Sequence, residues 1–271
     1  MLTLAVASIA TYVLVRRART RTTTTTTSDL PAIDHVVLLR LRDNEFTKLQ
    51  LKQALEELPR QIPGLIDLTC GPTYNLTRAN GFTHGLVARI QSKEALSKYA
   101  IHPDHLDVKA LIIKAIQPLR KMEDVNKGTI TLPPLLAVDY HSTRVRGTCY
   151  AQRSLPTSTT HIVLLCLRPS CHGKCASCVL LDEKLFSAAE KMAKGIPGLC
   201  DITFGRTFTQ ERSRGYTHCL NVRFVNENAE KMYQTHDLHQ MFKKHLSGHL
   251  TRTLGSNLPS VCCLDWVGTR R

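Results

Sequence analysis

The sequence predicts an α+β fold in which two copies of one βαββααβ unit form a single barrel within the chain. Three observations predict this fold. A long segment is repeated, both copies have the same order of strand-like and helix-like segments, and the strands are too apolar for one sheet face to remain in water. The length of 271 residues allows two domains of roughly 100 to 130 residues each.

The internal repeat is the strongest signal in the chain. His35-Val-Val-Leu-Leu-Arg-Leu-Arg42 recurs as His161-Ile-Val-Leu-Leu-Cys-Leu-Arg168. From Ile62 to His105 the second copy lies at a constant offset of 134, and 18 of 44 positions are identical. A match of this length indicates a duplicated domain.

The first half of each copy reads as strand, helix, strand and strand. In the first copy, residues 35–41 are almost all apolar, which predicts a buried strand. Residues 46–60 have apolar residues at helical spacing, and Pro59 is expected to end that helix. An Ile-Pro-Gly-Leu turn then leads into strands predicted at 65–70 and 83–90.

The second half of each copy reads as two helices and a last strand. Ser92 is a suitable N-cap for a helix that runs to about Tyr99. Pro103 separates this helix from a second one that runs to about residue 119, and 137–140 form the last strand. The order is a split βαβ, or ferredoxin-like, unit with its helices on one sheet face.

The domain organisation follows from this repeat. Repeat 1 covers 33–140 and repeat 2 covers 159–267, with a linker at 141–158 that is rich in Ser, Thr, Arg and Gly. Each half alone would leave one apolar sheet face uncovered. We therefore expect the two halves to close into one barrel about a pseudo-twofold axis, giving a monomer with an internal pseudo-dimer; a homodimer of such chains is the alternative.

Residues 1–28 are predicted to be an N-terminal targeting or anchor segment. The apolar stretch 2–15 would make a helix of about 21 Å, short against the roughly 30 Å of bilayer hydrocarbon, so membrane contact through it is one expectation. Four arginines and no acids within 1–28 also fit an organelle transit peptide for a mitochondrion or plastid. Without such targeting the chain would be cytoplasmic. Cysteines inside apolar strands favour a reducing compartment.

The formal net charge of +14 suits acidic ligands or anionic surfaces. The basic residues are dispersed, however, and no nucleic-acid recognition motif is present, so we expect no specific nucleic-acid partner. The sequence also lacks a phosphate-binding Walker loop, a dinucleotide fingerprint, a Gly-x-Ser-x-Gly elbow and a His-Glu-x-x-His motif. These classes of enzyme are therefore not expected, and neither is a cofactor.

Several short motifs recur in both copies. They are His35-Val-Val, Ile62-Pro-Gly, Gly81-Phe-Thr-His84, Tyr99, His102-Pro-Asp-His105 and Val138-Asp-Tyr140, with their counterparts in the second copy. Together these motifs resemble the stress-responsive A/B barrel (Dabb) family. The resemblance covers about 35–140 and 161–266 and implies a dimeric α/β barrel, made here by a tandem two-copy member.

The resemblance also implies candidate site residues. Some plant members are polyketide cyclases, in which a tyrosine after the helix and the second histidine of His-Pro-x-His carry the acid–base chemistry. These positions are Tyr99 and His105 in the first copy and Tyr233 and His239 in the second. The cyclases have a further tyrosine in the first helix. Leu55 and Ala189 stand at that position here, which argues against cyclase activity.

The chemistry of these pairs is plausible, but a structural role fits them as well. A histidine can remove a proton at physiological pH and a tyrosine can donate to a developing enolate. Alternatively, the histidines cap helices and the tyrosines belong to the core. Four strand histidines are either ligand-lining or hydrogen-bonded core residues, namely His35, His84, His161 and His218. Arg78 and Arg212 are read as surface residues, with anion binding as the alternative.

A cysteine cluster occurs only in the second copy. Cys171, Cys175 and Cys178 are weak candidates for a metal or redox site, because structural zinc needs four ligands, and an exposed loop of free thiols is the simpler interpretation.

Three functions stay open from the sequence. The first is a stress-responsive barrel protein that binds a small organic molecule without catalysis. The second is a polyketide-cyclase-like enzyme that performs an intramolecular aldol cyclisation with a Tyr/His pair. The third is a metal- or redox-linked protein that acts through the cysteine cluster.

Overall fold

The computed structural model describes residues 31–118, 120–124, 128–151, 157–167, 176–251 and 258–269. The targeting or anchor segment expected at 1–28 lies outside them, as do Cys171 and Cys175. In these described ranges, the structure contains no helix with the length and apolar character needed to cross a membrane.

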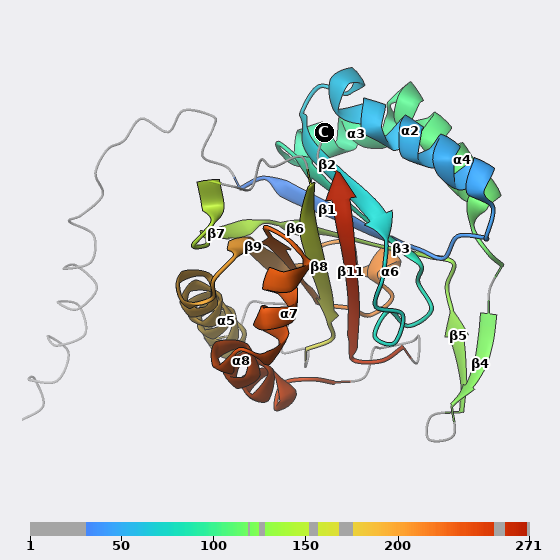
Figure 1. Cartoon of the computed structure of the whole chain (residues 1–271). Helices are drawn as coiled ribbons and strands as arrows, with labels where there is room; N and C mark the ends of the chain where they lie inside the picture. Colours follow the sequence, from blue (N-terminus) through green and yellow to red (C-terminus); the bar gives the residue numbers. More distant parts are fainter. Residues whose placement is uncertain are drawn as a thin grey trace, which may run out of the picture. The chain divides into compact units, whose positions relative to one another are not determined.

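Both repeats have the predicted βαββααβ order (Figure 1). The first repeat consists of β1 (Ile33–Leu39), α2 (Glu45–Gln61), β2 (Leu65–Pro72), β3 (His84–Ile90), α3 (Lys93–Ile101), α4 (Pro103–Ala115) and β6 (Leu135–His141). The second consists of β8 (Thr157–Leu165), α5 (Ala176–Gly195), β9 (Leu199–Arg206), α6 (Gln210–Ser213), β10 (His218–Phe224), α7 (Glu227–Thr235), α8 (Asp237–Ser247) and β11 (Val261–Thr269). The sequence did not indicate α6, nor the hairpin of β4 (Arg120–Asp124) and β5 (Gly128–Leu132).

Local chemistry sets the ends of these elements. Ser92 accepts a hydrogen bond from the backbone N–H of Ala95, at 3.2 Å, and so caps α3 as expected. Pro59 does not end α2, which continues to Gln61, because a proline in the last turn removes only one of its hydrogen bonds. Gly64 has φ +87°, and Gly198 has φ +78° at the same turn of the second repeat, which explains the repeated glycine.

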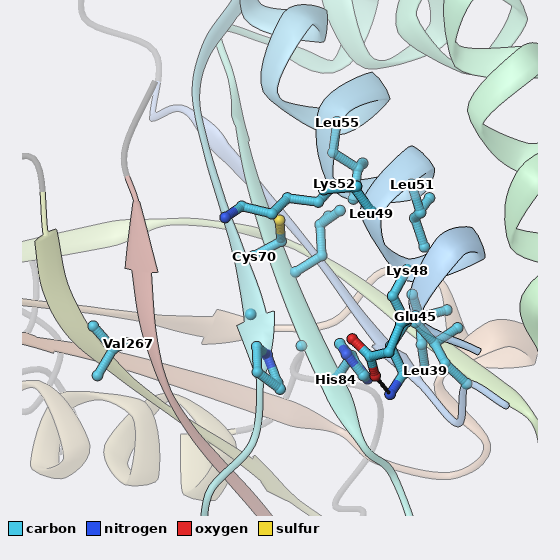
Figure 2. A pocket seen from close by; sticks show the side chains of 15 residues that line it. Leu39, Glu45, Lys48, Leu49, Leu51, Lys52, Leu55, Cys70, His84 and Val267 are labelled. Atoms are coloured by element: carbon cyan, nitrogen blue, oxygen red, sulfur yellow. Dashed lines mark hydrogen bonds and ion pairs between the residues drawn. The ribbon is translucent and has the colours of Figure 1, made fainter. Parts of the chain in front are cut away.

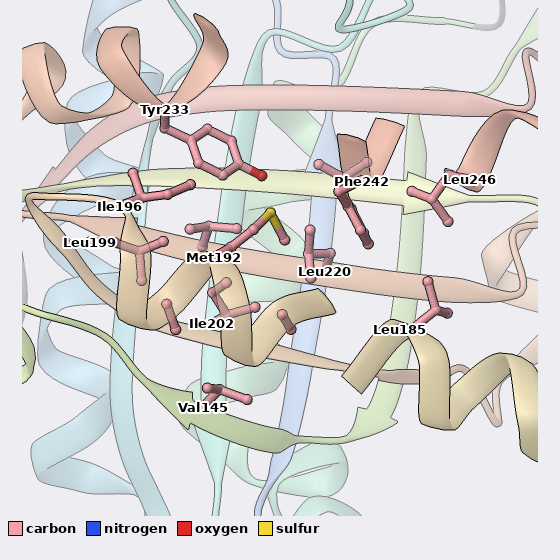
Figure 3. Close-up of a cluster of buried hydrophobic side chains, with 14 of the residues drawn as sticks. Val145, Leu185, Met192, Ile196, Leu199, Ile202, Leu220, Tyr233, Phe242 and Leu246 are labelled. Carbon is pink, nitrogen blue, oxygen red and sulfur yellow. The ribbon is translucent and has the colours of Figure 1, made fainter. Parts of the chain in front are cut away.

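The repeated strands form two antiparallel sheets with the same order, and β4 and β5 form a separate two-stranded sheet. The first sheet is β6-β1-β3-β2. The second is β11-β8-β10-β9, with β7 (Thr143–Arg146) added at its edge. Part of the stretch expected to be linker, 141–158, therefore belongs to the second sheet. Val145 of β7 is buried in the apolar cluster of the second repeat (Figure 3).

Each sheet has helices on its outer face and the other repeat on its inner face. α2, α3 and α4 cover the first sheet, and α5, α7 and α8 cover the second (Figure 1). The inner faces share one apolar cluster with residues of both repeats. It includes Val36, Leu38, Val138, Ile162, Leu164, Leu264 and Trp266.

Trp266 requires glycine at two facing positions. A Cβ atom at Gly85 would lie 2.4 Å from the indole ring, and one at Gly71 would lie 2.7 Å from it. Real Cβ atoms do not approach so closely, so the indole fills space that only glycine leaves free. The side chain of Trp266 is fully buried and is therefore held in one position between the two repeats.

The sheet edges meet at two places related by the pseudo-twofold axis. The backbone N–H of Tyr74, after β2, donates to the carbonyl of Asp265 on β11 at 3.0 Å. The backbone N–H of Phe208, after β9, donates to the carbonyl of Asp139 on β6, also at 3.0 Å. These contacts join the repeats within the described residues, whereas closure into one continuous barrel stays a prediction.

A buried ion network also joins the repeats. Arg223 on β10 donates to Asp201 of its own repeat at 2.8 Å and to Asp67 of the first repeat at 3.2 Å. Arg89 on β3 pairs with Asp34 at 3.1 Å. Buried charges are costly without partners, so this network favours one specific pairing of the repeats.

Candidate functional site

A histidine–aspartate pair lies beneath the helices of the first repeat. His35 on β1 contacts Asp139 on the neighbouring strand β6, with 2.5 Å between Nδ1 and Oδ1. Both side chains are buried. Tyr99, at the end of α3, lies edge-on to the His35 ring with centroids 5.9 Å apart. His105 on α4 packs against Tyr99 with centroids 4.0 Å apart.

The second repeat reproduces this arrangement. His161 on β8 hydrogen-bonds Asp265 on β11. Tyr233 lies edge-on to His161 at 5.7 Å, and His239 stacks on Tyr233 at 3.9 Å with the rings 22° from parallel. The structure therefore brings the tyrosines and histidines together in both copies, as the acid–base interpretation requires.

Each aspartate also receives an arginine from the opposite repeat. Arg212 on α6 donates to Asp139, and Arg78, before β3, lies 3.6 Å from Asp265. Burial alone would raise the pKa of Asp139, but His35 and Arg212 outweigh it and hold this pKa below its usual value. His161 and Arg78 lower the pKa of Asp265 against its burial in the same way. Both carboxyl groups are therefore ionised at neutral pH.

The tyrosine–histidine pairs are poor proton carriers at neutral pH. Burial lowers the pKa of His105 to about 4 and the pKa of His239 to about 3. Burial raises the pKa of both Tyr99 and Tyr233 above the usual tyrosine range. All four side chains are thus neutral, and each is distant in pKa from the value that acid–base catalysis favours.

A separate cavity of about 370 Å³ opens in the first repeat between α2 and the outer face of the sheet (Figure 2). His84 at the start of β3 faces it, together with Cys70 on β2. Its wall is mainly apolar and is formed by Leu39, Leu41, Leu49, Leu51, Leu55, Leu86 and Val267. His35, Tyr99 and His105 are not among the residues that line it.

The four strand histidines occupy two kinds of position. His35 and His161 are bonded to the buried aspartates. His84 shares its Nδ1 with the Thr83 hydroxyl at 2.9 Å and faces the cavity, and burial lowers its pKa to about 4. His218 contacts Thr217 at 2.8 Å and Asp182 at 3.3 Å instead.

Metal ligation is not favoured by the described residues. One group, His161, Glu230 and Asp265, brings its ligand atoms within 4.8 Å of one another. The His161 Nδ1 is already bonded to Asp265, and Arg78 places a positive charge beside the same carboxylate. In the cysteine cluster, Cys171 and Cys175 lie outside the described residues. Cys178 belongs to helix α5.

Sequence reasoning missed the two aspartates and the role of the two arginines. Arg78 and Arg212 are partly exposed, with 39% and 52% of the side chain accessible, yet they reach aspartates that are fully buried. A signal was present, because Val138-Asp-Tyr140 and Leu264-Asp-Trp266 correspond in the two copies, as do the two arginines. Only the three-dimensional pairing of the repeats shows that they meet.

The fold and the paired sites define an α+β protein built from two ferredoxin-like repeats. The model of the stress responsive A/B barrel domain matches residues 33–126 and 160–267, and the chain belongs to this family. Two curated relatives are stress-response A/B barrel domain-containing proteins of Arabidopsis thaliana. The first is 26% identical over 186 residues, and the second is 27% identical over 189 residues.

These matches cover 68% of this chain in both cases, together with 62% of the first relative and 77% of the second. The chain therefore matches about three fifths of the length of the first relative. Two solved structures share the fold at low identity. A protein of Fusobacterium nucleatum named as a candidate monooxygenase has a TM-score of 0.57 at 9% identity, covering 89% of this chain and 94% of its own. An anthrone oxidase-like protein has a TM-score of 0.56 at 8% identity, covering 91% and 95%.

Proposed function

We propose that this protein binds a small, uncharged organic molecule in the cavity between α2 and the first sheet. The observation that carries the proposal is the cavity itself, which has about 370 Å³ of space behind a wall of leucines. This size lies within the range of small-molecule sites, which are mostly apolar with a few polar groups that orient the ligand.

The polar groups at the cavity favour a neutral ligand, because Lys52 on its wall is exposed and keeps its charge in water. Lys48 bonds to Asp43 at 2.7 Å and to Glu45 at 2.8 Å, so its charge is already balanced. His84 is neutral at pH 7 because burial lowers its pKa to about 4. A neutral imidazole can donate or accept one hydrogen bond, which suits a carbonyl or hydroxyl group on an otherwise apolar molecule.

Binding without catalysis fits the cavity better than an aldol cyclisation. A cyclase would need an acid and a base in contact with its substrate. Tyr99 and His105 do not line the cavity, and Leu55 occupies the position of the additional tyrosine of the cyclases. The repeated stack of tyrosine on histidine is instead consistent with a structural role beneath the helices.

Equilibrium binding of a fluorescent probe tests the proposal. N-phenyl-1-naphthylamine is uncharged and becomes fluorescent in apolar surroundings, so titration into the full-length chain reports occupancy of the cavity. Leu49 lines the cavity but is 54% exposed, and Leu49→Glu should weaken probe binding at least tenfold without unfolding the protein. Leu106→Glu is the matched control, because Leu106 is 46% exposed on α4 and does not line this cavity.

Two results would count against the proposal. Absence of probe binding to the wild-type chain would contradict it directly. Equal binding by the Leu49→Glu and Leu106→Glu variants would show that the probe binds elsewhere on the protein.

A further inference from the structure

We infer that the first repeat alone keeps an open ligand site, and that aromatic side chains and an ion cluster fill the corresponding site of the second repeat. This inference rests on the proposed binding function and deepens it. Each chain therefore binds one ligand. The residues at positions 52 and 70, and at the equivalent positions 186 and 204, determine whether a site is open.

The two repeats differ at positions that superpose by sequence and register. Cys70 on β2 pairs with Leu86, and Phe204 on β9 pairs with Leu220. Phe204 lies 134 residues after Cys70, and Leu220 lies 134 residues after Leu86. The same offset relates Lys52 on α2 to Phe186 on α5. Two phenylalanines of the second repeat therefore stand where the first repeat has a thiol and an exposed, flexible amine.

The two phenylalanines fill the space between helix and sheet. The rings of Phe186 and Phe204 lie with centroids 6.0 Å apart at 46°, a usual geometry for packed aromatic pairs. Both pack against the buried apolar cluster of the second repeat, which also contains Leu185 and Leu220 (Figure 3). In the first repeat, Lys52 and Cys70 stand on the cavity wall (Figure 2).

The mouth of the second site is closed by charges. Asp182 on α5 accepts from Arg206 on β9 at 3.3 Å and contacts the Nε2 atom of His218, also at 3.3 Å. These contacts tie the helix to the sheet. The pKa of Asp182 is held below its usual value because His218 and Arg206 outweigh its partial burial.

The first repeat cannot form this closure. Lys48 and Pro72 replace Asp182 and Arg206, and proline has no side-chain donor. Lys48 turns to Asp43 and Glu45 rather than to the sheet. His84, the counterpart of His218, is therefore left facing the cavity.

Three cavities on the described part of the second repeat do not reach Phe186 or Phe204. One cavity at the end of the sheets, beside Gln210 and Tyr216, borders the ion cluster at Arg206. The two others lie between α5 and α8 beside Met241 and at the start of α7 beside Asn226. The second repeat also contributes residues to the first repeat. Its Val267 lines the open cavity, and its Arg212 pairs with Asp139.

Counting bound probe in exchange variants of the full-length chain tests this inference. Saturation titration at protein concentrations well above Kd should give one equivalent of N-phenyl-1-naphthylamine per wild-type chain. The variant Lys52→Phe/Cys70→Phe carries the residues of the second repeat and should bind none. The reverse exchange, Phe186→Lys/Phe204→Cys, should bind up to two equivalents, and circular dichroism would verify that both variants are folded.

The outcomes separate this inference from the proposed function. A wild-type chain that binds no probe would remove the binding function itself. Two equivalents on the wild-type chain would keep that function but overturn the inference, as would a folded Lys52→Phe/Cys70→Phe variant that still binds one equivalent. The wild-type chain and the Lys52→Phe/Cys70→Phe variant decide the question. The test therefore holds even if the Phe186→Lys/Phe204→Cys variant does not fold.

Discussion

Arg212, on a short helix of the second repeat, forms an ion pair with Asp139, on the last strand of the first repeat. The reciprocal pair joins Arg78 of the first repeat to Asp265 of the second. Each histidine–aspartate pair is therefore completed by a residue from the opposite repeat. Neither repeat folded alone would contain the full set of contacts around its own buried carboxylate.

Each repeat supplies an arginine to the buried aspartate of the other repeat, so removal of one of these arginines should lower the stability of the protein. Arg212→Ala should lower the free energy of unfolding by about 1 kcal/mol, and Asp139→Ala, which also leaves His35 without its partner, by about 3 kcal/mol. Arg60→Ala is the control, since Arg60 forms only an exposed pair with Glu57 at 3.2 Å. Urea denaturation followed by circular dichroism measures these values, and equal effects of Arg212→Ala and Arg60→Ala would contradict the prediction.

Most of the fold was predictable because its signals are local or repeated. The apolar runs, the helical spacing and the Ser92 cap each lie within a short stretch of sequence. The second copy shows the same order of elements again, which supports the assignment. Strand β7 was not predictable in this way. It has four residues with one buried side chain, Val145, and it exists because β9 offers an edge for pairing.

The candidate site was predictable only in part. The spacing of Tyr99 and His105 allowed the two rings to meet but did not require it, and the stacking depends on how α3 and α4 pack. The ion pair between Arg212 and Asp139 joins residues 73 positions apart in different repeats. No pattern within one copy could reveal it, because it arises from the pairing of the two copies.

The packing of Trp266 predicts a sharp difference between two glycines. Gly85→Ala places a Cβ atom 2.4 Å from the indole ring and should destabilise the protein by about 2 kcal/mol, the usual cost of overpacking a core. Gly248→Ala should leave stability nearly unchanged, because nothing lies within 4 Å of its Cβ position and its φ of −69° suits alanine. Thermal unfolding of both variants distinguishes them, and a Gly85→Ala protein as stable as wild type would refute the packing described for Trp266.

The buried histidines predict that stability falls as the pH is lowered below about 6.5. Burial lowers the pKa of His239 to about 3 in the folded protein, whereas it is about 6.5 in the unfolded chain. The unfolded state therefore binds the proton first, so the contribution is complete above pH 6.5 and declines toward pH 3. His239→Phe keeps a ring against Tyr233 but cannot titrate, and it should flatten the dependence of the urea midpoint on pH between 6.5 and 4.5. An unchanged slope in this variant would show that other groups cause the loss.

The wall of the open cavity predicts an unreactive thiol at Cys70. Burial raises the pKa of Cys70 to about 11, with a smaller contribution from the charge of Glu56. Because the thiolate is the reactive form, alkylation of Cys70 by iodoacetamide should rise about tenfold for each pH unit from 7 to 10 without a plateau. Mass spectrometry of the Cys70 peptide measures the rate on the folded chain. Urea-unfolded protein supplies the control, in which the rate should be half-maximal near the ordinary thiol pKa of about 8.5 and level off about one pH unit above it. Saturating N-phenyl-1-naphthylamine should slow the reaction further at every pH, because Cys70 lines the cavity that the probe is proposed to fill. A plateau below pH 9.5 would contradict the burial of this thiol, and a rate unaffected by the probe would place the probe outside the cavity.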